Sequence, residues 1–311
     1  MKMVSELNDH EHVEGQFLVG SVSKGVNTVG GSYFSVELRD ASGSITAKKW
    51  DATLEDEQII VTGNVISLSG ETNKYKDQLQ LKILTAELVA LENIDVARFV
   101  KAPPVSKEEL VKRFNAHVAS IKNEDCLKII NYFLKKFGED IFSFPAAVSI
   151  HHEYSSGLLM HSVSMADLAT YLCPIYDADH DILVTGCLLL DLGKIIELEG
   201  PIVYKYSTEG KLLGHISIMA AEVRKAAEEL GLKSEVPVLL EHMILSHHGQ
   251  LEFGSPVLPI TKEALLLSLI DNLDSKMVVV DKTLSDVDEG GFTNKVYPLD
   301  NRAFYKPKKL K

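Results

Sequence analysis

The chain of 311 residues contains the run Leu188-Leu189-Leu190-Asp191-Leu192-Gly193-Lys194. Its apolar residues continue a helical pattern, so we expect a buried helix to end near Asp191. Lys194 follows three positions later and therefore lies on roughly the same face. The run predicts a helix that brings a carboxylate and an ammonium group to one place.

Histidines gather in the half of the chain that contains this run. Eight of the eleven lie between His151 and His248. A lone histidine on an apolar helix face is usually an ordinary core residue, and a helical bundle with scattered polar core residues is the alternative interpretation. The clustering, together with two aspartates in apolar helices, favours a metal site. The candidate ligands are His161, Asp191, His215, His247, His248 and Asp271.

The chemistry of these groups suggests which metal they would bind. Asp271 interrupts the apolar run 264–270, where an unpaired buried charge is too costly, so it must pair or bind a metal. Imidazole and carboxylate ligands from separate helices suit a divalent metal, with Mn²⁺ as first choice and Fe²⁺ or Mg²⁺ as alternatives. Such a metal activates a bound water and polarises a phosphoryl oxygen. Asp191 and Lys194 are the candidate catalytic residues, because the lysine can stabilise charge on a phosphate.

The pattern of the sequence changes near residue 103, which predicts a multidomain α and β protein. Short alternating segments with Gly, Ser and Asn turn signals predict a small β-barrel, with strands at 16–22, 32–38, 44–50, 59–69 and 78–83. Helical periodicity then predicts an all-α domain, with helices at 124–137, 158–172, 182–191, 215–230, 237–246 and 262–280. We expect a barrel domain at 1–100, a helical domain at 101–300 beginning with a linker at 101–104, and a loosely ordered basic tail at 301–311.

Aromatic and basic residues alternate in the barrel segment. Tyr33 and Trp50 lie on consecutive predicted strands beside Lys48 and Lys49, a pattern typical of single-strand nucleic-acid binding. Tyr33 and Phe34 must point to opposite faces, so Tyr33 is the better candidate for an outward position. The alternative is that Phe34 and Trp50 fill the barrel core. The net charge of −12 argues only against binding through bulk positive charge.

Composition also favours a particular compartment. The N-terminus shows no signal-peptide pattern, and no apolar run approaches the roughly 18 residues of a membrane span. Three cysteines stand without a Cys-x-x-Cys pair, which indicates buried thiols in a reducing compartment. We therefore expect a cytoplasmic protein without a membrane partner.

Taken together, the ligand candidates resemble those of the HD phosphohydrolase superfamily. The whole chain resembles the YhaM-type 3′-to-5′ exoribonucleases of bacteria, through further matches at His151-His152, at Asp271-Asn272-Leu273-Asp274 and in the ending 301–308. This resemblance implies an N-terminal OB-fold and a C-terminal HD domain that depends on a divalent metal. It also implies stepwise removal of 3′ nucleotides from single-stranded RNA. Two questions stay open at this point: whether single-stranded DNA is also a substrate, and whether the chain forms a homo-oligomer.

The chain departs from the family pattern at two positions. Leu190 occupies the place of the histidine in the His-Asp pair that names the superfamily, and leucine cannot bind a metal. Ser268 stands where relatives of this type are expected to have a histidine. The loss of an imidazole ligand should weaken the metal site, so a catalytically dead nucleic-acid-binding protein is one alternative. A nucleotide phosphohydrolase is the other, although a small nucleotide needs no strand-binding barrel.

Overall fold

The computed structural model describes residues 1–26, 30–100, 105–145, 156–200 and 204–309. The chain divides into two compact units, one built on residues 1–106 with 147–157 and 198–207, and one that comprises the remainder. The expected linker at 101–104 and the pair His151-His152 lie outside the described residues.

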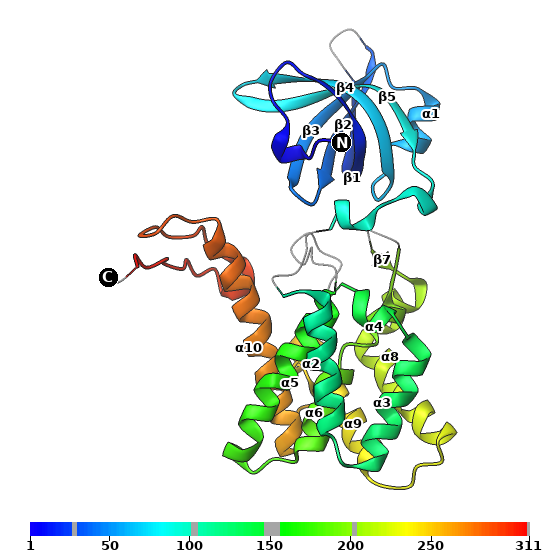
Figure 1. The fold of residues 1–311 in the computed structure, drawn as a ribbon, viewed down its shortest axis with the longest axis vertical. Helices are drawn as coiled ribbons and strands as arrows, with labels where there is room; N and C mark the ends of the chain where they lie inside the picture. Colours follow the sequence, from blue (N-terminus) through cyan, green and yellow to red (C-terminus); the bar gives the residue numbers. More distant parts are fainter. Residues whose placement is uncertain (27–29, 101–104, 146–155, 201–203, 310–311) are drawn as a thin grey trace. The chain divides into compact units, whose positions relative to one another are not determined.

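The first unit contains a closed five-stranded barrel with strand order β1-β2-β3-β5-β4 (Figure 1). Its elements are β1 (His12–Val26), β2 (Ser32–Asp40), β3 (Gly43–Trp50), the short helix α1 (Leu54–Ile59), β4 (Val65–Tyr75) and β5 (Gln78–Leu88). The long strand β1 pairs antiparallel with β4 through 12–18 and with β2 through 18–26, with an irregularity between Val19 and Ser21. Parallel pairing of β3 with β5 closes the barrel.

Strand alternation decides which aromatic residues enter the barrel. Phe34 is 2% exposed and packs in the core with Phe17 and Leu38. Tyr33 lies on the opposite face of β2, as expected, and Trp50 is 41% exposed at the end of β3. Of the two aromatic residues that the alternative placed in the core, Phe34 is buried there and Trp50 is not.

The strand predicted at 59–69 is wrong in its first part. Thr53 and Asp56 form a reciprocal capping box, in which each side chain accepts a hydrogen bond from the other residue's main-chain N–H, at 3.2 and 2.9 Å. This local arrangement starts α1. Ile60 packs in the barrel core just after the helix, so its apolar character reflects burial, and the strand itself begins at Val65.

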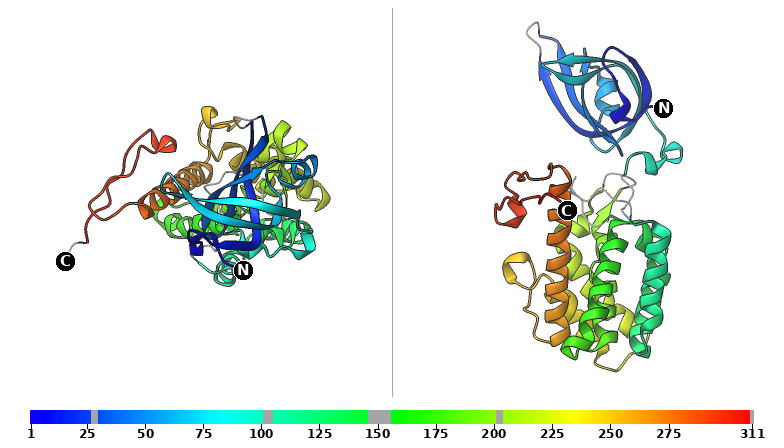
Figure 2. Two further views of the ribbon diagram at one scale, coloured as in Figure 1. Left: turned by 90° about the horizontal axis from the view of Figure 1, so that it is seen from above. Right: turned by 60° about the vertical axis from the view of Figure 1, so that its left-hand side comes forward.

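The second unit is a bundle of helices, which confirms the predicted division into a barrel and an all-α part (Figures 1 and 2). Its helices are α2 (Lys107–Ser120), α3 (Glu124–Phe137), α4 (Asp140–Ser143), α5 (Gly157–Tyr176), α6 (His180–Leu189), α7 (Lys194–Glu197), α8 (Thr208–Glu229), α9 (Val236–Ser246) and α10 (Lys262–Ser285). Side-chain caps begin several of them: Asn123 for α3, Asp179 for α6 and Thr261 for α10. The short strands β6 (Leu198–Glu199) and β7 (Lys205–Tyr206), which lie between α7 and α8 in the sequence and belong to the first unit, pair antiparallel with each other.

Helix α5 is long and apolar enough, at 20 residues, to pass a length and composition test for a membrane span. This corrects the expectation that no apolar run reaches such a length. Half of its apolar window is buried inside the bundle, and Leu158, Leu159 and Val163 are fully enclosed. We therefore describe α5 as a core helix of the bundle.

The C-terminal segment is better ordered than a loose tail. Phe292 pairs antiparallel with Tyr305, and Val296 with Arg302. The N–H groups of Gly290 and Lys306 donate to carbonyls across the same pair of strands, at 2.7 and 2.9 Å. Two basic side chains also donate to main-chain carbonyls, Arg302 Nε to Leu299 at 3.0 Å and Lys306 Nζ to Val287 at 2.7 Å. Charge composition alone does not reveal such pairing.

Candidate metal centre

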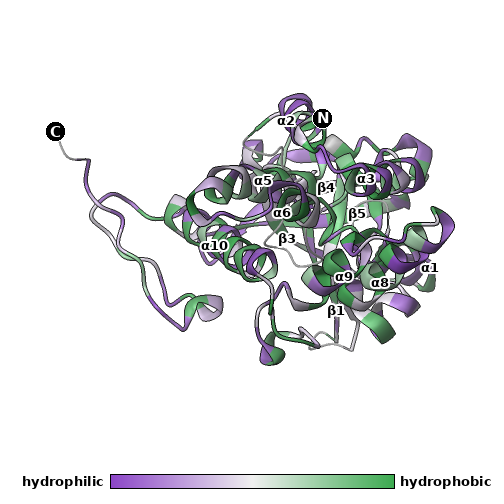
Figure 3. Cartoon of the chain, turned by 90° about the horizontal axis from the view of Figure 1, so that it is seen from below, coloured by the Kyte–Doolittle hydropathy of each residue, from purple (hydrophilic) through white to green (hydrophobic). Residues whose placement is uncertain are grey.

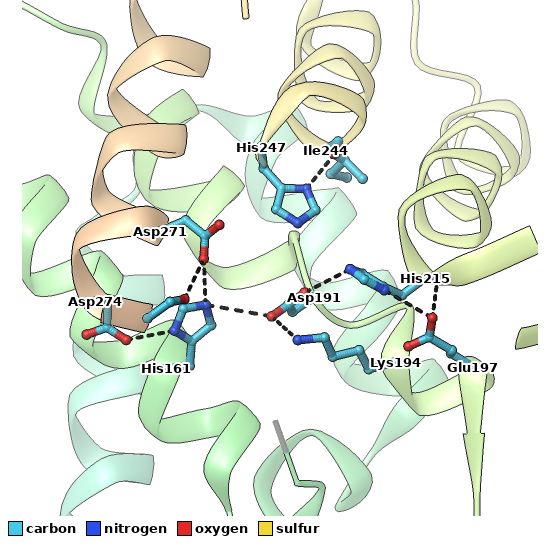
Figure 4. A network of polar contacts seen from close by, with 10 residues as sticks. His161, Asp191, Lys194, Glu197, His215, Ile244, His247, Asp271 and Asp274 are labelled. Atoms are coloured by element: carbon cyan, nitrogen blue, oxygen red, sulfur yellow. Dashed lines mark hydrogen bonds and ion pairs between the residues drawn. The ribbon is translucent and has the colours of Figure 1, made fainter. Parts of the chain in front are cut away.

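The ligand candidates come from five regions of the bundle and meet at one place (Figure 4). His161 lies in the second turn of α5, and Asp191 follows the end of α6, with Lys194 at the start of α7. The remaining ligand candidates are His215 on α8, His247 and His248 at the end of α9, and Asp271 on α10. Helices far apart in sequence thus supply the candidate ligands of one site.

Two glycines allow this convergence. A Cβ on Gly193 would run into the carbonyl oxygen of His215, so only glycine permits the loop after Asp191 to approach α8 so closely. Gly214 has φ 72° and kinks α8 immediately before His215. The sequence therefore shapes the main chain at the site as well as supplying its side chains.

One side of the centre is organised around His161. Its Nδ1 lies 2.7 Å from Asp274 Oδ2, and its Nε2 lies 3.2 Å from Asp271 Oδ1 and 3.6 Å from Asp191 Oδ2. Burial opposes charge on this ring, but the hydrogen bonds to Asp271 and Asp274 and the charge of Asp191 raise the pKa of His161 to about 10. Without a metal, a proton on this ring therefore holds the carboxylates together.

The other side is built from His215, His247 and His248, whose candidate ligand atoms all lie within 4.8 Å of one another. Nδ1 of His247 lies 2.6 Å from the carbonyl oxygen of Ile244, and Nδ1 of His248 lies 2.6 Å from that of Phe253. A carbonyl can only accept, so each Nδ1 carries the hydrogen and leaves the lone pair on Nε2. Histidines that bind metals usually have their second nitrogen tied in this way.

His215 is oriented by a carboxylate. Glu197 accepts hydrogen bonds from the main-chain N–H of His215 at 3.0 Å and from its Nδ1 at 3.1 Å. Burial tends to raise the pKa of Glu197, but the bonds from His215 outweigh it and lower that pKa. The carboxylate therefore stays ionised and fixes the ring with Nε2 as its free nitrogen.

Three of the converging atoms are buried without a hydrogen-bond partner among the described residues: Asp191 Oδ1, His215 Nε2 and His247 Nε2. The first two of these atoms lie 3.6 Å apart. Buried polar atoms are nearly always satisfied, so these three lack a partner of positive charge. A divalent cation fits both their chemistry and their convergence.

Electrostatics keep two of the ligand candidates, Asp191 and His247, in the protonation state that a metal needs. Burial alone would raise the pKa of Asp191, but Lys194, His215 and His161 hold it well below its ordinary value. Lys194 Nζ lies 2.7 Å from Asp191 Oδ2. Burial lowers the pKa of His247 to about 4, so the ring is neutral at pH 7.

The two departures from the family pattern are both buried. Leu190 is fully enclosed, and its N–H donates to the carbonyl of Gly186 at 2.9 Å. The Ser268 hydroxyl donates to the carbonyl of Leu265 in its own helix at 3.0 Å. Neither side chain replaces a missing imidazole.

Two functional residues escaped the prediction of the site. Asp274 holds His161 and also accepts a hydrogen bond from Ser164 Oγ, and Glu197 holds His215. Asp274 follows Asp271 by three positions, so helical spacing could have identified it. Glu197 carries no such signal, because only the turn between α7 and α8 brings it to His215.

Three of the four candidate strand-binding residues of the barrel lie together, and Lys49 does not join them. The rings of Tyr33 and Trp50 lie 4.9 Å apart, and Lys48 Nζ lies 4.8 Å above the Tyr33 ring. Lys49 points elsewhere, since its Nζ donates to the carbonyl of Leu84 at 3.1 Å and lies 3.7 Å from Asp56. The platform therefore consists of Tyr33, Trp50 and Lys48, with Trp50 exposed and the other two half-buried.

Comparison with known proteins agrees with both halves of this architecture. Residues 158–276 match the HD domain family model, and residues 18–89 match a model described as an OB-fold nucleic acid binding domain. The fold and the site thus define a protein in which an OB-fold accompanies an HD-domain metal centre.

The particular family follows from a longer match. The 3′-5′ exoribonuclease YhaM of Geobacillus sp. (strain WCH70) is 42% identical over 299 residues, which cover 96% of this chain and 92% of that protein. The chain belongs to this YhaM family of exoribonucleases.

Two solved structures show distant likenesses to the chain. The second OB-fold domain of replication protein A from Methanococcus maripaludis is 18% identical over 28% of this chain and 93% of that one, with a TM-score of 0.24. RecG bound to a three-way DNA junction is 14% identical over 92% of this chain and 40% of that one, also with a TM-score of 0.24. Scores this low establish nothing further about the chain.

Proposed function

We propose that the chain is a divalent-metal-dependent enzyme that removes nucleotides stepwise from the 3′ end of single-stranded RNA. Family membership supports the reaction, and the three unpartnered buried atoms at the metal centre carry the proposal for this chain. Mn²⁺ is the metal we propose, because the donor set combines imidazoles with carboxylates.

Each group of residues has a distinct role in this proposal. His161, Asp191 and Asp271 would hold a metal on one side, and His215, His247 and His248 on the other, with the two oxygens of Asp191 facing both sides. When bound, the metal supplies an activated water and polarises the phosphate. Lys194 stabilises charge on the phosphate, since its ammonium group is already held at the site by Asp191.

We further propose that the barrel platform of Tyr33, Trp50 and Lys48 holds the strand. Bases stack on exposed aromatic rings at about 1–3 kcal/mol each, and a lysine beside them contacts phosphates. Stacking tolerates any base, which suits an enzyme that shortens strands of varied sequence. Single-stranded DNA offers the same rings and phosphates, so it is a second substrate to test.

We place this activity in the cytoplasm. Cys126, Cys173 and Cys187 are free and buried, which suits a reducing compartment. Burial raises the pKa of Cys126 to about 11, so this thiol is unreactive at neutral pH.

The experiment that tests the function uses 5′-labelled single-stranded RNA and Mn²⁺. We expect a ladder of products shortened from the 3′ end, and Asp191→Asn should abolish the ladder while RNA binding remains. The control Glu228→Gln, at an exposed carboxylate of α8, should behave like the parent protein. If the Asp191→Asn protein still produced the ladder of shortened RNA, the assignment of Asp191 to the metal centre would be wrong.

Leu190 favours a second candidate function, a nucleic-acid-binding protein with an inactive HD domain. The same experiment separates the two, because such a protein would retain the labelled strand in a binding assay and leave its length unchanged. Cleavage of free nucleotides but not of RNA would point to a nucleotide phosphohydrolase.

A further inference from the structure

The donors of the metal centre fall into two sides that meet at the carboxylate of Asp191 (Figure 4). One side, which we call the imidazole side, comprises Oδ1 of Asp191 with His215, His247 and His248. The other, which we call the carboxylate side, comprises Oδ2 of Asp191 with His161 and Asp271. The two sides differ in how far the protein itself already satisfies their donors.

The imidazole side is buried and unsatisfied. Nε2 of His215, Nε2 of His247 and Oδ1 of Asp191 have no hydrogen-bond partner among the described residues. No second set of three His, Cys, Asp or Glu side chains as close together as the three histidines is found in the part of the chain that the structure describes. Figure 3 shows α6 and α9, the two helices that end at the centre, as strongly hydrophobic, and unmet polar atoms are costly in such surroundings.

The donors of the carboxylate side already have partners. Nδ1 of His161 is taken by Asp274, and its Nε2 lies 3.2 Å from Oδ1 of Asp271. Oδ2 of Asp191 accepts a hydrogen bond from Nζ of Lys194 at 2.7 Å. A cation that entered this side would have to separate these pairs, and the ammonium group of Lys194 would repel it at close range.

We propose that the two sides bind divalent ions in a fixed order. The imidazole side binds one ion tightly, and the carboxylate side receives a second ion only at much higher concentration. Lys194 sets this order, because its ammonium group supplies the positive charge at Oδ2 of Asp191 that a second ion would otherwise supply. Leu190 adds no donor to either side. This inference rests on the proposed function, since it concerns the same centre.

The test is isothermal titration calorimetry of the full chain with Mn²⁺ in the absence of RNA. We expect a tight step of one ion per chain and a second step whose dissociation constant is at least about a hundredfold higher. Electron paramagnetic resonance at one equivalent of Mn²⁺ should show isolated ions and no coupled pairs. Neither measurement depends on turnover.

The role of Lys194 is tested by changing its charge. Lys194→Met should lower the dissociation constant of the second step at least about tenfold and leave the first step unchanged. Lys194→Arg keeps the charge and should retain the spacing of the two steps. The control Lys225→Met, at an exposed lysine of α8, should bind Mn²⁺ as the parent does. Circular dichroism would establish that each variant is folded.

Two results would overturn this inference while leaving the proposed function in place. One is two ions bound with equal affinity by the parent protein, and the other is an unchanged second step in a folded Lys194→Met protein. Both are compatible with a ladder of shortened RNA. A parent protein that binds no Mn²⁺ at all would overturn this inference and the proposed function together.

Discussion

At the scale of single residues, position 190 carries the largest functional question. Leu190 is enclosed at the end of α6 and adjoins Asp191, whose Oδ1 has no hydrogen-bond partner among the residues described. An imidazole at 190 would offer one more nitrogen at this end of the helix. Leucine offers only hydrocarbon, so a metal bound here would have fewer ligands than the superfamily pattern provides.

We predict that Leu190→His accelerates Mn²⁺-dependent degradation of single-stranded RNA at least about tenfold, equivalent to about 1.4 kcal/mol of transition-state stabilisation. Single-turnover cleavage of a 5′-labelled strand, with equal metal loading, measures the effect. Leu189→His is the matched control, because it places the same side chain at the preceding buried leucine. Equal rates for Leu190→His and the parent protein would mean that position 190 lies outside the metal shell.

Glu197 is the second residue with a specific consequence. We predict that Glu197→Gln weakens Mn²⁺ binding about tenfold, because a neutral amide holds the His215 ring without increasing the basicity of its Nε2. Isothermal titration calorimetry measures the affinity without any need for turnover. Glu199→Gln, at a carboxylate that is 56% exposed, should bind Mn²⁺ as the parent does. Unchanged affinity in Glu197→Gln would limit Glu197 to a purely structural role.

At the scale of elements, the centre brings together groups from helices that are far apart in the sequence. α5, the turn after α6, α8, α9 and α10 each contribute one or two of its groups, and three buried atoms there have no hydrogen-bond partner in the part of the chain that the structure describes. A metal bound by these groups would cross-link the second unit, and its removal should loosen the unit as a whole.

We predict that Mn²⁺ at about one hundred times its dissociation constant stabilises the helical unit by about 2.7 kcal/mol and raises its midpoint of thermal unfolding by roughly 5–10 °C. Circular dichroism at 222 nm follows the helices, and a chelator should reverse the gain. Asp191→Asn supplies the control, since it removes the carboxylate that faces both sides of the site. A midpoint indifferent to both metal and chelator would argue against a metal in this centre.

Periodicity and ligand chemistry were sufficient to predict the barrel, the main helices and six converging ligand candidates. They failed where a local or long-range contact decides the structure. The capping box of Thr53 and Asp56 starts a helix in place of a strand, and Lys49 is drawn to Asp56 and away from the platform. Glu197 and the paired C-terminal hairpin depend on chain segments meeting in space, which no spacing rule records.

At the scale of the whole molecule, the proposed function gives the two compact units different tasks. The barrel presents Tyr33, Trp50 and Lys48, and the helical unit presents the metal centre. Affinity for long strands and the rate of the chemical step should therefore respond to different substitutions.

We predict that Trp50→Ala weakens binding of long single-stranded RNA about tenfold, because the loss of one stacking ring costs about 1–3 kcal/mol. Cleavage of an oligonucleotide too short to engage the barrel should keep its kcat. Filter binding and single-turnover kinetics measure the two quantities, with Tyr171→Ala, an exposed tyrosine of α5, as control. A parallel loss of both would show that the platform acts within the catalytic step.

The main-chain anchors of His247 and His248 have a consequence for how this family tolerates mutation. Ile244 and Phe253 orient the two rings through carbonyl oxygens, and every amino acid supplies a carbonyl. Side-chain replacements at 244 or 253 therefore leave the hydrogen-bond acceptor in place, provided that the path of the chain is kept. Substitutions at these two positions therefore keep the orientation of both imidazole rings. The His215 ring differs, because its acceptor is the side-chain carboxylate of Glu197, which a single substitution removes.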